Sequence, residues 1–280
     1  LLHLGATSVT LSDASDDPVL EPGPGETPLW AHTRITGLFD ASADLAALPG
    51  ALQEMLDVAE LPAWHIEELE DRDWEREWLK DFGPMQFGER LWICPTVGGA
   101  LAPNTFGPEG PPTIVYLDPG LAFGTGTHPT TAMCLEWLDG IDLAGKSVLD
   151  YGCGSGILGI AALKLGAAAA SGMDIDPQAV IATHQNAAEN GVAMRVWRSD
   201  DEIEGRFDVI VANILAGPLV ELADSITSRL ASRGMLALSG VLCEQAPDVL
   251  TAYDPWIEFD EPQFREQDGQ TWSRLTGSRR

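Results

Sequence analysis

The sequence predicts an α/β fold, in which a doubly wound, mostly parallel sheet follows a small α/β domain. From about residue 83 on, apolar runs alternate with helical patterns, and this strand–helix alternation predicts a parallel sheet. The apolar runs are largely unbroken, as expected for strands that are covered on both faces. Before residue 83, short patterns are mixed with Pro- and Gly-rich stretches, which indicates a separate and smaller unit.

Residues 1–66 are expected to form the small α/β domain. The segments "SVTLSDA" (8–14) and "AWHIEEL" (63–69) read as strands, and "PVLEPGPGETPLW" (18–30) reads as a loop. Between these segments, leucines recur at helical spacing, and Pro49–Gly50 is expected to interrupt the helix. The leucines concerned are Leu45, Leu48, Leu52 and Leu56.

Residues 67–82 are expected to form a helical linker. This segment, "EELEDRDWEREWLKDF", is strongly charged and carries Trp74 and Trp78 four residues apart, on one face of the predicted helix. Residues 83–280 then hold the large parallel-sheet domain.

In the large domain, helix punctuation supports the predicted order. Asp176–Pro177 is a typical helix start, and Asn190–Gly191 is a typical helix end. After Pro255, two strands of a terminal hairpin are expected. Strands are predicted at 147–152, 168–175, 193–199, 207–214 and 234–241, and helices at 156–166, 177–191 and 217–231.

The chain carries a formal net charge of -27, with lysine only at positions 80, 146 and 164. Such a charge argues against nucleic-acid binding by phosphate neutralisation. Two interpretations remain open: a solvated acidic surface suited to a salty habitat, or an acidic face that attracts a basic partner. The even spread of the charge along the sequence favours the first.

The sequence also indicates the cellular compartment of the protein. No apolar run reaches the roughly 18 residues of a membrane span, and no signal-peptide pattern opens the chain. The four cysteines form no C-x-x-C pair and no Cys/His cluster with zinc spacing. We therefore expect a cytoplasmic protein with reduced thiols, no metal ion and no membrane contact. A monomer is expected as well, although no sequence pattern determines the oligomeric state.

Residues 139–160, "DGIDLAGKSVLDYGCGSGILGI", contain three nucleotide-site motifs at once. Gly140 to Ser147 matches a P-loop, but a P-loop must follow a strand and open a helix, whereas this one precedes a strand. Gly154 to Gly159 matches a dinucleotide fingerprint, but its last glycine lies inside the predicted helix. The remaining motif, D-x-G-x-G-x-G from Asp150 to Gly156, is typical of S-adenosylmethionine sites.

Charge favours this third motif. A carboxylate at Asp150 repels a pyrophosphate, but it stabilises the sulfonium and ammonium groups of S-adenosylmethionine. Gly152 and Gly154 permit close approach of the backbone. Asp174, at the end of the next strand, can accept both ribose hydroxyls. The alternative interpretation is that the glycines serve only tight packing between helix and strand.

Flanking segments extend the match. "DWEREWLKDFGPMQFGERLWICP" (73–95), "LDPGLAFGTGTHPTT" (117–131) and "VANIL" (211–215), together with "DYGCGSG" and "MDIDP", resemble the methyltransferases that modify ribosomal protein L11. The resemblance covers essentially the whole chain. It implies a seven-stranded class I methyltransferase sheet preceded by a ferredoxin-like domain that recognises the ribosomal protein. That small domain is expected to lack its first strand.

By this resemblance, S-adenosylmethionine is the cofactor. Phe123 and Thr131 belong to the loop that closes over it, Gly152 and Gly154 pack on its methionine part, and Asp174 binds its ribose. Asn213 lies between cofactor and target amine and is the expected catalytic residue. If these two residues had only structural roles, Phe123 would lie in the core and Thr131 would cap a helix.

The resemblance further implies that the N-terminal and lysine amines of ribosomal protein L11 receive the methyl groups. The Asn213 amide oxygen would accept a hydrogen bond from the amine and orient its lone pair. His128 is a candidate general base, although a loop hydrogen bond is its ordinary role. Cys153 is expected to be a small filler in the glycine turn, and His184 to lie on the surface.

Three other functions stay open from the residues alone. These are a class I methyltransferase that acts on another protein or a small-molecule amine, a nucleotide-binding oxidoreductase, and a binding protein without catalysis. Binding of a nicotinamide dinucleotide, or cofactor binding without turnover, would distinguish the last two.

Overall fold

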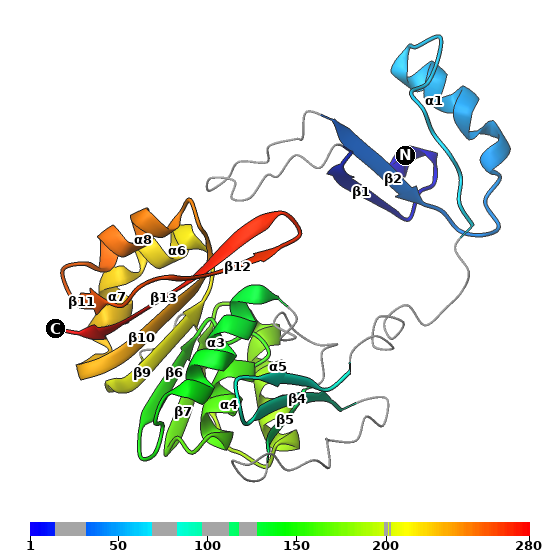
Figure 1. The fold of residues 1–280 in the computed structure, drawn as a ribbon. Helices are drawn as coiled ribbons and strands as arrows, with labels where there is room; N and C mark the ends of the chain where they lie inside the picture. The colour runs from blue at the N-terminus through cyan, green and yellow to red at the C-terminus, as the bar shows by residue number, and fades with distance from the viewer. Residues whose placement is uncertain (15–31, 69–82, 97–111, 118–127, 199–200, 202) are drawn as a thin grey trace. The chain divides into compact units, whose positions relative to one another are not determined.

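The computed structural model of the chain describes residues 1–280 except 15–31, 69–82, 97–111, 118–127, 199–200 and 202 (Figure 1). The chain divides into two compact units, Leu1–Arg72 and Asp73–Arg280. Most of the helical linker predicted at 67–82 lies outside the described residues. Within the described residues, no helix is long and apolar enough to cross a membrane.

The first unit contains a small antiparallel sheet and a helix. β1 (Ser8–Asp13) pairs with β2 (Thr33–Leu38), and η1 (Leu2–Leu4) precedes them. Asp44 caps η2 (Leu45–Ala47) by accepting a hydrogen bond from the Ala46 amide.

α1 (Leu48–Leu56) follows η2 and begins just before the predicted break at Pro49–Gly50. Proline is tolerated in the first helical turn because that N–H needs no partner there. The expectation of an interrupted helix was therefore wrong. The strand expected at 63–69 was wrong too, because residues 63–68 belong to no strand and Trp64 and Ile66 are exposed.

The second unit is built on the predicted doubly wound sheet. Seven strands follow the order β11-β13-β10-β9-β6-β7-β8, and β12 adds an eighth strand on β13. The four pairs among β10, β9, β6, β7 and β8 are parallel, and those made by β13 are antiparallel. The strands are β6 (Ser147–Tyr151), β7 (Ala169–Asp174), β8 (Arg195–Arg198), β9 (Phe207–Asn213), β10 (Leu230–Leu242), β11 (Ile257–Phe259), β12 (Gln263–Gln267) and β13 (Gln270–Arg279).

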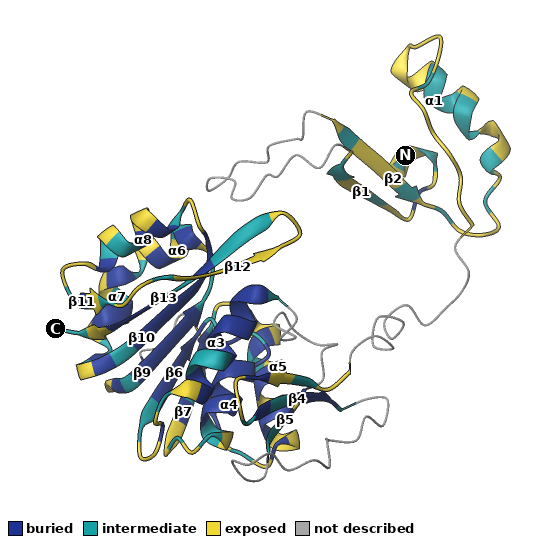
Figure 2. Ribbon diagram, in the orientation of Figure 1, coloured by how far each residue is buried: buried dark blue, intermediate teal, exposed yellow. Residues whose placement is uncertain are grey.

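Helices cover both faces of this sheet. Successive strand residues point to opposite sides, and both sides carry apolar residues that need to be covered. Val148 and Val209 belong to one hydrophobic core with α3 (Pro129–Gly140) and α4 (Ile157–Lys164). Their neighbours Leu149 and Ile210 belong to a second core on the other face. Figure 2 shows the central strands buried over most of their length, with more exposed residues toward their ends. The helices on the second face are α6 (Ala216–Glu221), α7 (Ala223–Ser228) and α8 (Ala246–Tyr253).

The helix predicted at 177–191 is present, whereas two later elements differ from the prediction. α5 (Pro177–Glu189) begins at its Asp176 cap, whose side chain accepts the Gln178 amide, and ends at Asn190. The single helix expected at 217–231 is instead split at Leu222 into α6 and α7. The terminal segment holds three strands rather than two, because the run from 257 to 267 breaks between β11 and β12.

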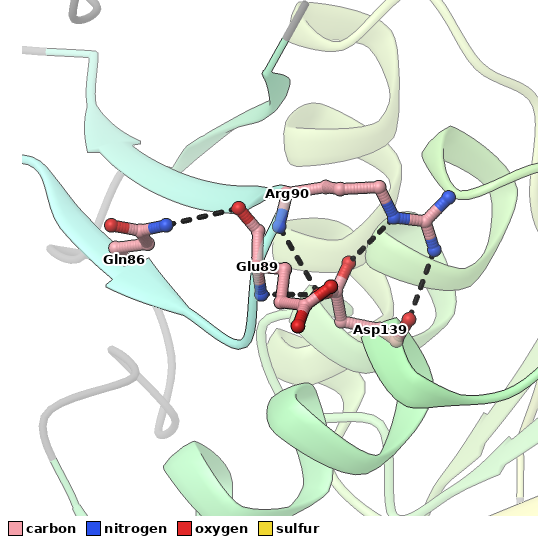
Figure 3. A network of polar contacts seen from close by, with 4 residues as sticks. All are labelled: Gln86, Glu89, Arg90 and Asp139. Carbon is pink, nitrogen blue, oxygen red and sulfur yellow. Dashed lines mark hydrogen bonds and ion pairs between the residues drawn. The ribbon is translucent and has the colours of Figure 1, made fainter. Parts of the chain in front are cut away.

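A three-stranded sheet precedes α3. β3 (Met85–Phe87) pairs antiparallel with β4 (Leu91–Pro95), and β4 pairs parallel with β5 (Thr113–Leu117). The β3–β4 turn is fastened to α3 by Asp139 (Figure 3). Its Oδ2 accepts the amides of Glu89 at 2.6 Å and Arg90 at 3.2 Å, and the Arg90 guanidinium donates to the Asp139 carbonyl at 2.9 Å.

Candidate functional site

The glycine turn lies between β6 and α4, where the sequence places it. Gly152, Gly154 and Gly156 have φ angles of 78°, 53° and 79°, which residues with a Cβ rarely adopt. A Cβ at Gly152 would collide with the Ile214 side chain, which follows β9 directly. The turn therefore packs against the residue that follows β9, and this contact by itself requires a glycine at position 152.

The end of β7 is tied to the same turn. The Gly154 amide donates to Asp174 Oδ2 at 2.8 Å, and the Asp176 amide donates to Asp174 Oδ1 at 2.9 Å. The carboxylate is thus held in one orientation by two backbone donors. Each of its oxygens has a second lone pair, so it retains the capacity to accept hydroxyl donors.

Thr131 and Asn213 meet, although 82 residues separate them in sequence. The Asn213 amide nitrogen donates to Thr131 Oγ1 at 3.1 Å. Asn213 is the last residue of β9, and Thr131 is buried in the first turn of α3. With its nitrogen engaged in this bond, the Asn213 amide has Oδ1 as its acceptor. Thr131 does not cap the helix, because His128 does.

His128 is held by the start of α3. Its Nδ1 accepts the Thr130 amide and lies 2.7 Å from the Thr130 hydroxyl, and its ring meets Trp272 edge-on, with the centroids 4.6 Å apart. Burial lowers the pKa of His128, so the ring is neutral at pH 7. The bond from the Thr130 amide to Nδ1 favours the tautomer that carries its proton on Nε2. This favours the helix-cap role over that of general base.

The position of Asp150 differs from the expectation. The side chain is 1% exposed, and its Oδ2 accepts the Gly159 amide at 2.9 Å, inside α4. Burial, and to a lesser degree the charge of Asp174, raises the pKa of Asp150 to about 8. Asp150 is therefore largely protonated at neutral pH. The Asp150 carboxyl is thus buried against α4 and does not lie open in the turn, where the sequence analysis expected it to face the cofactor.

The remaining predicted residues are placed as follows. Phe123 lies outside the described residues. Cys153 is buried and 3.4 Å from the Thr183 hydroxyl, which agrees with a filler. His184 lies on the exposed side of α5. Among the described residues, no group of three or more His, Cys, Asp or Glu side chains could hold a metal ion.

Two residues near the site were missed in the sequence. Gly240 has a φ of 86° at a bulge in β10, and a Cβ there would collide with the Ile214 backbone. A glycine inside a strand pattern is a bulge signal, so this position could have been found. Trp272 gave no such signal, because only the fold places it beside His128.

These side chains fit S-adenosylmethionine. Asp174 and Asn213 offer oxygen acceptors at the ends of β7 and β9, and the turn from Asp150 to Gly156 contains no basic residue that would favour a phosphate. In sheets of this kind, ligands bind at the carboxyl ends of the strands. Asp174, Gly152, Gly154 and Thr131 would hold the cofactor there, with Asn213 beside them.

Comparisons with known proteins identify the family of the chain. The family model described as "Ribosomal protein L11 methyltransferase (PrmA)" matches residues 1–280. A ribosomal protein L11 methyltransferase from Aeromonas hydrophila subsp. hydrophila is 53% identical over 280 residues, which cover 99% of this chain and 91% of the relative. A ribosomal protein L11 methyltransferase from Klebsiella pneumoniae (strain 342) is 52% identical, over 99% of this chain and 92% of the relative.

A solved structure agrees as well. The crystal structure of a ribosomal protein L11 methylase from Lactobacillus delbrueckii subsp. bulgaricus is similar with a TM-score of 0.63 and 32% sequence identity. The similarity covers 71% of this chain and 100% of that chain. The predicted family, reaction and cofactor are confirmed. The chain belongs to the ribosomal protein L11 methyltransferase family and is an S-adenosylmethionine-dependent protein methyltransferase.

Proposed function

We propose that the chain methylates the N-terminal and lysine amines of its substrate, ribosomal protein L11, and that Asn213 aligns the amine. The observation that carries this proposal is the hydrogen bond from the Asn213 amide to Thr131 Oγ1. With its nitrogen engaged, Asn213 presents Oδ1 as an acceptor at the end of β9. A neutral amine can donate one N–H hydrogen bond to that oxygen and direct its lone pair away from it.

S-adenosylmethionine, when bound, supplies an electrophilic methyl group. The chain contributes alignment and the exclusion of water. Asp174 accepts the ribose hydroxyls, and Gly152 and Gly154 allow the backbone to approach the methionine part. Phe123 is proposed as an apolar gate.

The proposed acceptors must lose a proton before they react. An α-amino group has a pKa of about 8 and a lysine about 10.4, so the N-terminal amine is partly neutral at pH 7. His128 caps α3 with the nitrogen that a base would need. We therefore assign the deprotonation to water, before the amine docks.

The proposal extends to domain roles, compartment and oligomeric state. Residues 1–66 recognise the substrate protein, 67–82 form the linker, and 83–280 carry the reaction. The enzyme works as a cytoplasmic monomer on ribosomal protein L11, free or on the large subunit. It makes no direct contact with nucleic acid, because its charge of -27 repels phosphates.

The test is the intact mass of purified ribosomal protein L11 after incubation with the chain and S-adenosylmethionine. A ladder of methyl additions is expected, and peptide fragmentation should place them on amine nitrogens. Methyl groups on other atoms would contradict the amine assignment. No mass change, with S-adenosylmethionine bound in calorimetry, would point to another substrate.

A further inference from the structure

The hairpin near the end of the chain has an open edge. Among the strands that the structure describes, β12 pairs with β13 alone. Asp268 and Gly269 form its two-residue turn with φ angles of 53° and 76°. The residues flanking such a turn form a hydrogen-bonded pair, and bonded positions then alternate along the strands. The N–H and C=O groups of Phe264 and Glu266 therefore point outward.

This edge begins level with the candidate site. Asn213 pairs with Ser239 in β10, Ser239 pairs with Arg274 in β13, and Arg274 pairs with Gln263 in β12. From this row, β12 runs onward to its turn, beyond the carboxyl end of β9. A strand added outside β12 would lie four strand spacings from Asn213, which is about 19 Å.

The hairpin is anchored to α3, the helix that carries Thr131. Arg265 donates to both Glu136 oxygens at 3.0 and 2.8 Å, and Arg274 donates to the Met133 carbonyl at 2.6 Å. Trp272 contacts the His128 ring. In Figure 1 the β12–β13 hairpin reaches out beyond the rest of the sheet. An edge held in this way is formed before any partner binds, which lowers the entropy cost of docking.

The exposed side chains of the edge suit a basic segment. Glu261, Glu266 and Asp268 are exposed, and Arg265 is engaged with Glu136. Phe264 is 52% exposed. Its strand neighbour Arg265 faces α3, so Phe264 points to the other side, where it can pack against an aliphatic side-chain stem. Addition of a strand to an open edge is a common mode of peptide recognition.

We propose that the outer edge of β12 binds, as an added strand, a basic segment of the substrate protein that flanks the acceptor amine. The inference rests on the proposed function, because it takes the substrate to be a lysine-bearing protein. About 19 Å of extended chain at about 3.3 Å per residue corresponds to roughly six residues. The edge therefore holds a flanking segment and not the acceptor residue itself.

The test uses the full chain, ribosomal protein L11 and the variant Glu266→Pro. Proline removes an outward N–H and leaves the bonds between β12 and β13 in place. The KM for the substrate protein should rise about tenfold, the equivalent of one lost backbone hydrogen bond. The loss should appear in KM and not in kcat, and S-adenosylmethionine affinity should stay as in the parent. An unchanged KM would overturn the proposal.

Two charge-reversal variants test whether the position of the charge matters. Glu266→Lys should raise KM, and more strongly at low salt. Glu258→Lys, on the exposed side of β11 near the other end of β13, should not. Equal effects of the two variants would mean that only the overall charge matters and would overturn the proposal.

Amide hydrogen exchange separates this proposal from the proposed function. With substrate protein and S-adenosylhomocysteine, the Phe264 and Glu266 amides should become protected, whichever atom of the substrate is methylated. Methylation without protection would overturn the docking edge alone. Protection already present without substrate, together with a dimer in sedimentation, would assign the edge to a second copy of the chain and overturn the proposal.

Discussion

At the scale of single residues, the site depends on hydrogen bonds between side chains that lie far apart in sequence. Thr131 orients the Asn213 amide, and the Gly154 amide orients Asp174. Each of these bonds fixes an acceptor before a ligand arrives, which is the structural form of preorganisation.

Asn213→Ala should reduce kcat about a hundredfold, because the amine loses the acceptor that directs its lone pair. Steady-state methylation of ribosomal protein L11 would measure it, and the KM for the protein should change little. Thr131→Val keeps the shape but frees the amide to rotate, so a smaller loss is expected. If Asn213→Ala and the parent enzyme turn over at the same rate, Asn213 has no role in alignment.

Asp174→Ala should weaken S-adenosylmethionine binding by about 1–3 kcal/mol, the cost of lost hydrogen bonds to a charged group. Titration calorimetry gives the affinity directly. The Gly154 and Asp176 amides also lose their acceptor, so the fold should be checked by its unfolding midpoint. An unchanged dissociation constant would remove Asp174 from the site.

Asp150 makes the stability of the chain depend on pH. Its pKa is raised from 3.8 to about 8, so between these values the native state binds a proton that the unfolded state has released. Its stabilising contribution is complete below pH 3.8 and is lost as the pH rises toward 8. Relative to Asp150→Asn, the free energy of unfolding of the parent should fall by up to about 1.4 kcal/mol per pH unit.

Urea unfolding at pH 5, 6 and 7 would measure this slope. Asp150→Asn keeps an oxygen for the Gly159 amide and cannot ionise. Glu244→Gln, at an exposed carboxylate, is the control and should follow the parent. Parallel curves for Asp150→Asn and the parent would show that Asp150 titrates normally in the native state.

At the scale of elements, the β3–β4 turn depends on one carboxylate of α3. Asp139→Ala should destabilise the chain by about 1–3 kcal/mol, because two turn amides lose their acceptor. Arg90→Ala should cost less than about 1 kcal/mol, because the Arg90 side chain is 41% exposed and water screens the pair. Chemical denaturation compares the two variants. A larger loss for Arg90→Ala would mean that the ion pair matters more than the backbone hydrogen bonds.

Much of the element order could be predicted, because apolar runs and caps are local signals. The Asp176 cap and the buried run of β9 are read from neighbouring residues. The structure departs from the predicted elements where a local sequence pattern does not decide the conformation. Pro49 fits into a first turn, and the break between β11 and β12 interrupts a run that looks continuous.

The candidate site was less accessible to sequence reasoning. Residue identities at the strand ends suggested Asp174 and Asn213. Whether a carboxylate is ionised depends on its surroundings, however, and no local pattern shows that Asp150 is buried beneath α4. The contact between Trp272 and His128 likewise spans half the chain and needs the folded sheet.

At the scale of the whole molecule, a charge of -27 repels itself. Salt should raise the melting temperature of the chain, mostly below about 0.2 M, because the screening length falls from about 30 Å at 0.01 M to about 8 Å at 0.15 M. Melting curves in sodium chloride would show this. A gain that continues linearly to 1 M would indicate salt exclusion from the surface instead of screening.

The placement of the four thiols has a practical consequence. Cys94, Cys134 and Cys153 are buried, and burial raises the pKa of each, to about 12 for Cys134. Only thiolates react rapidly with alkylating reagents, so these three are inert. Cys243 is exposed, and its amide donates to the Thr271 carbonyl near the turn of the β12–β13 hairpin. A maleimide fluorophore would therefore attach at one place in the natural chain, next to the hairpin, and report its movements without any cysteine being replaced.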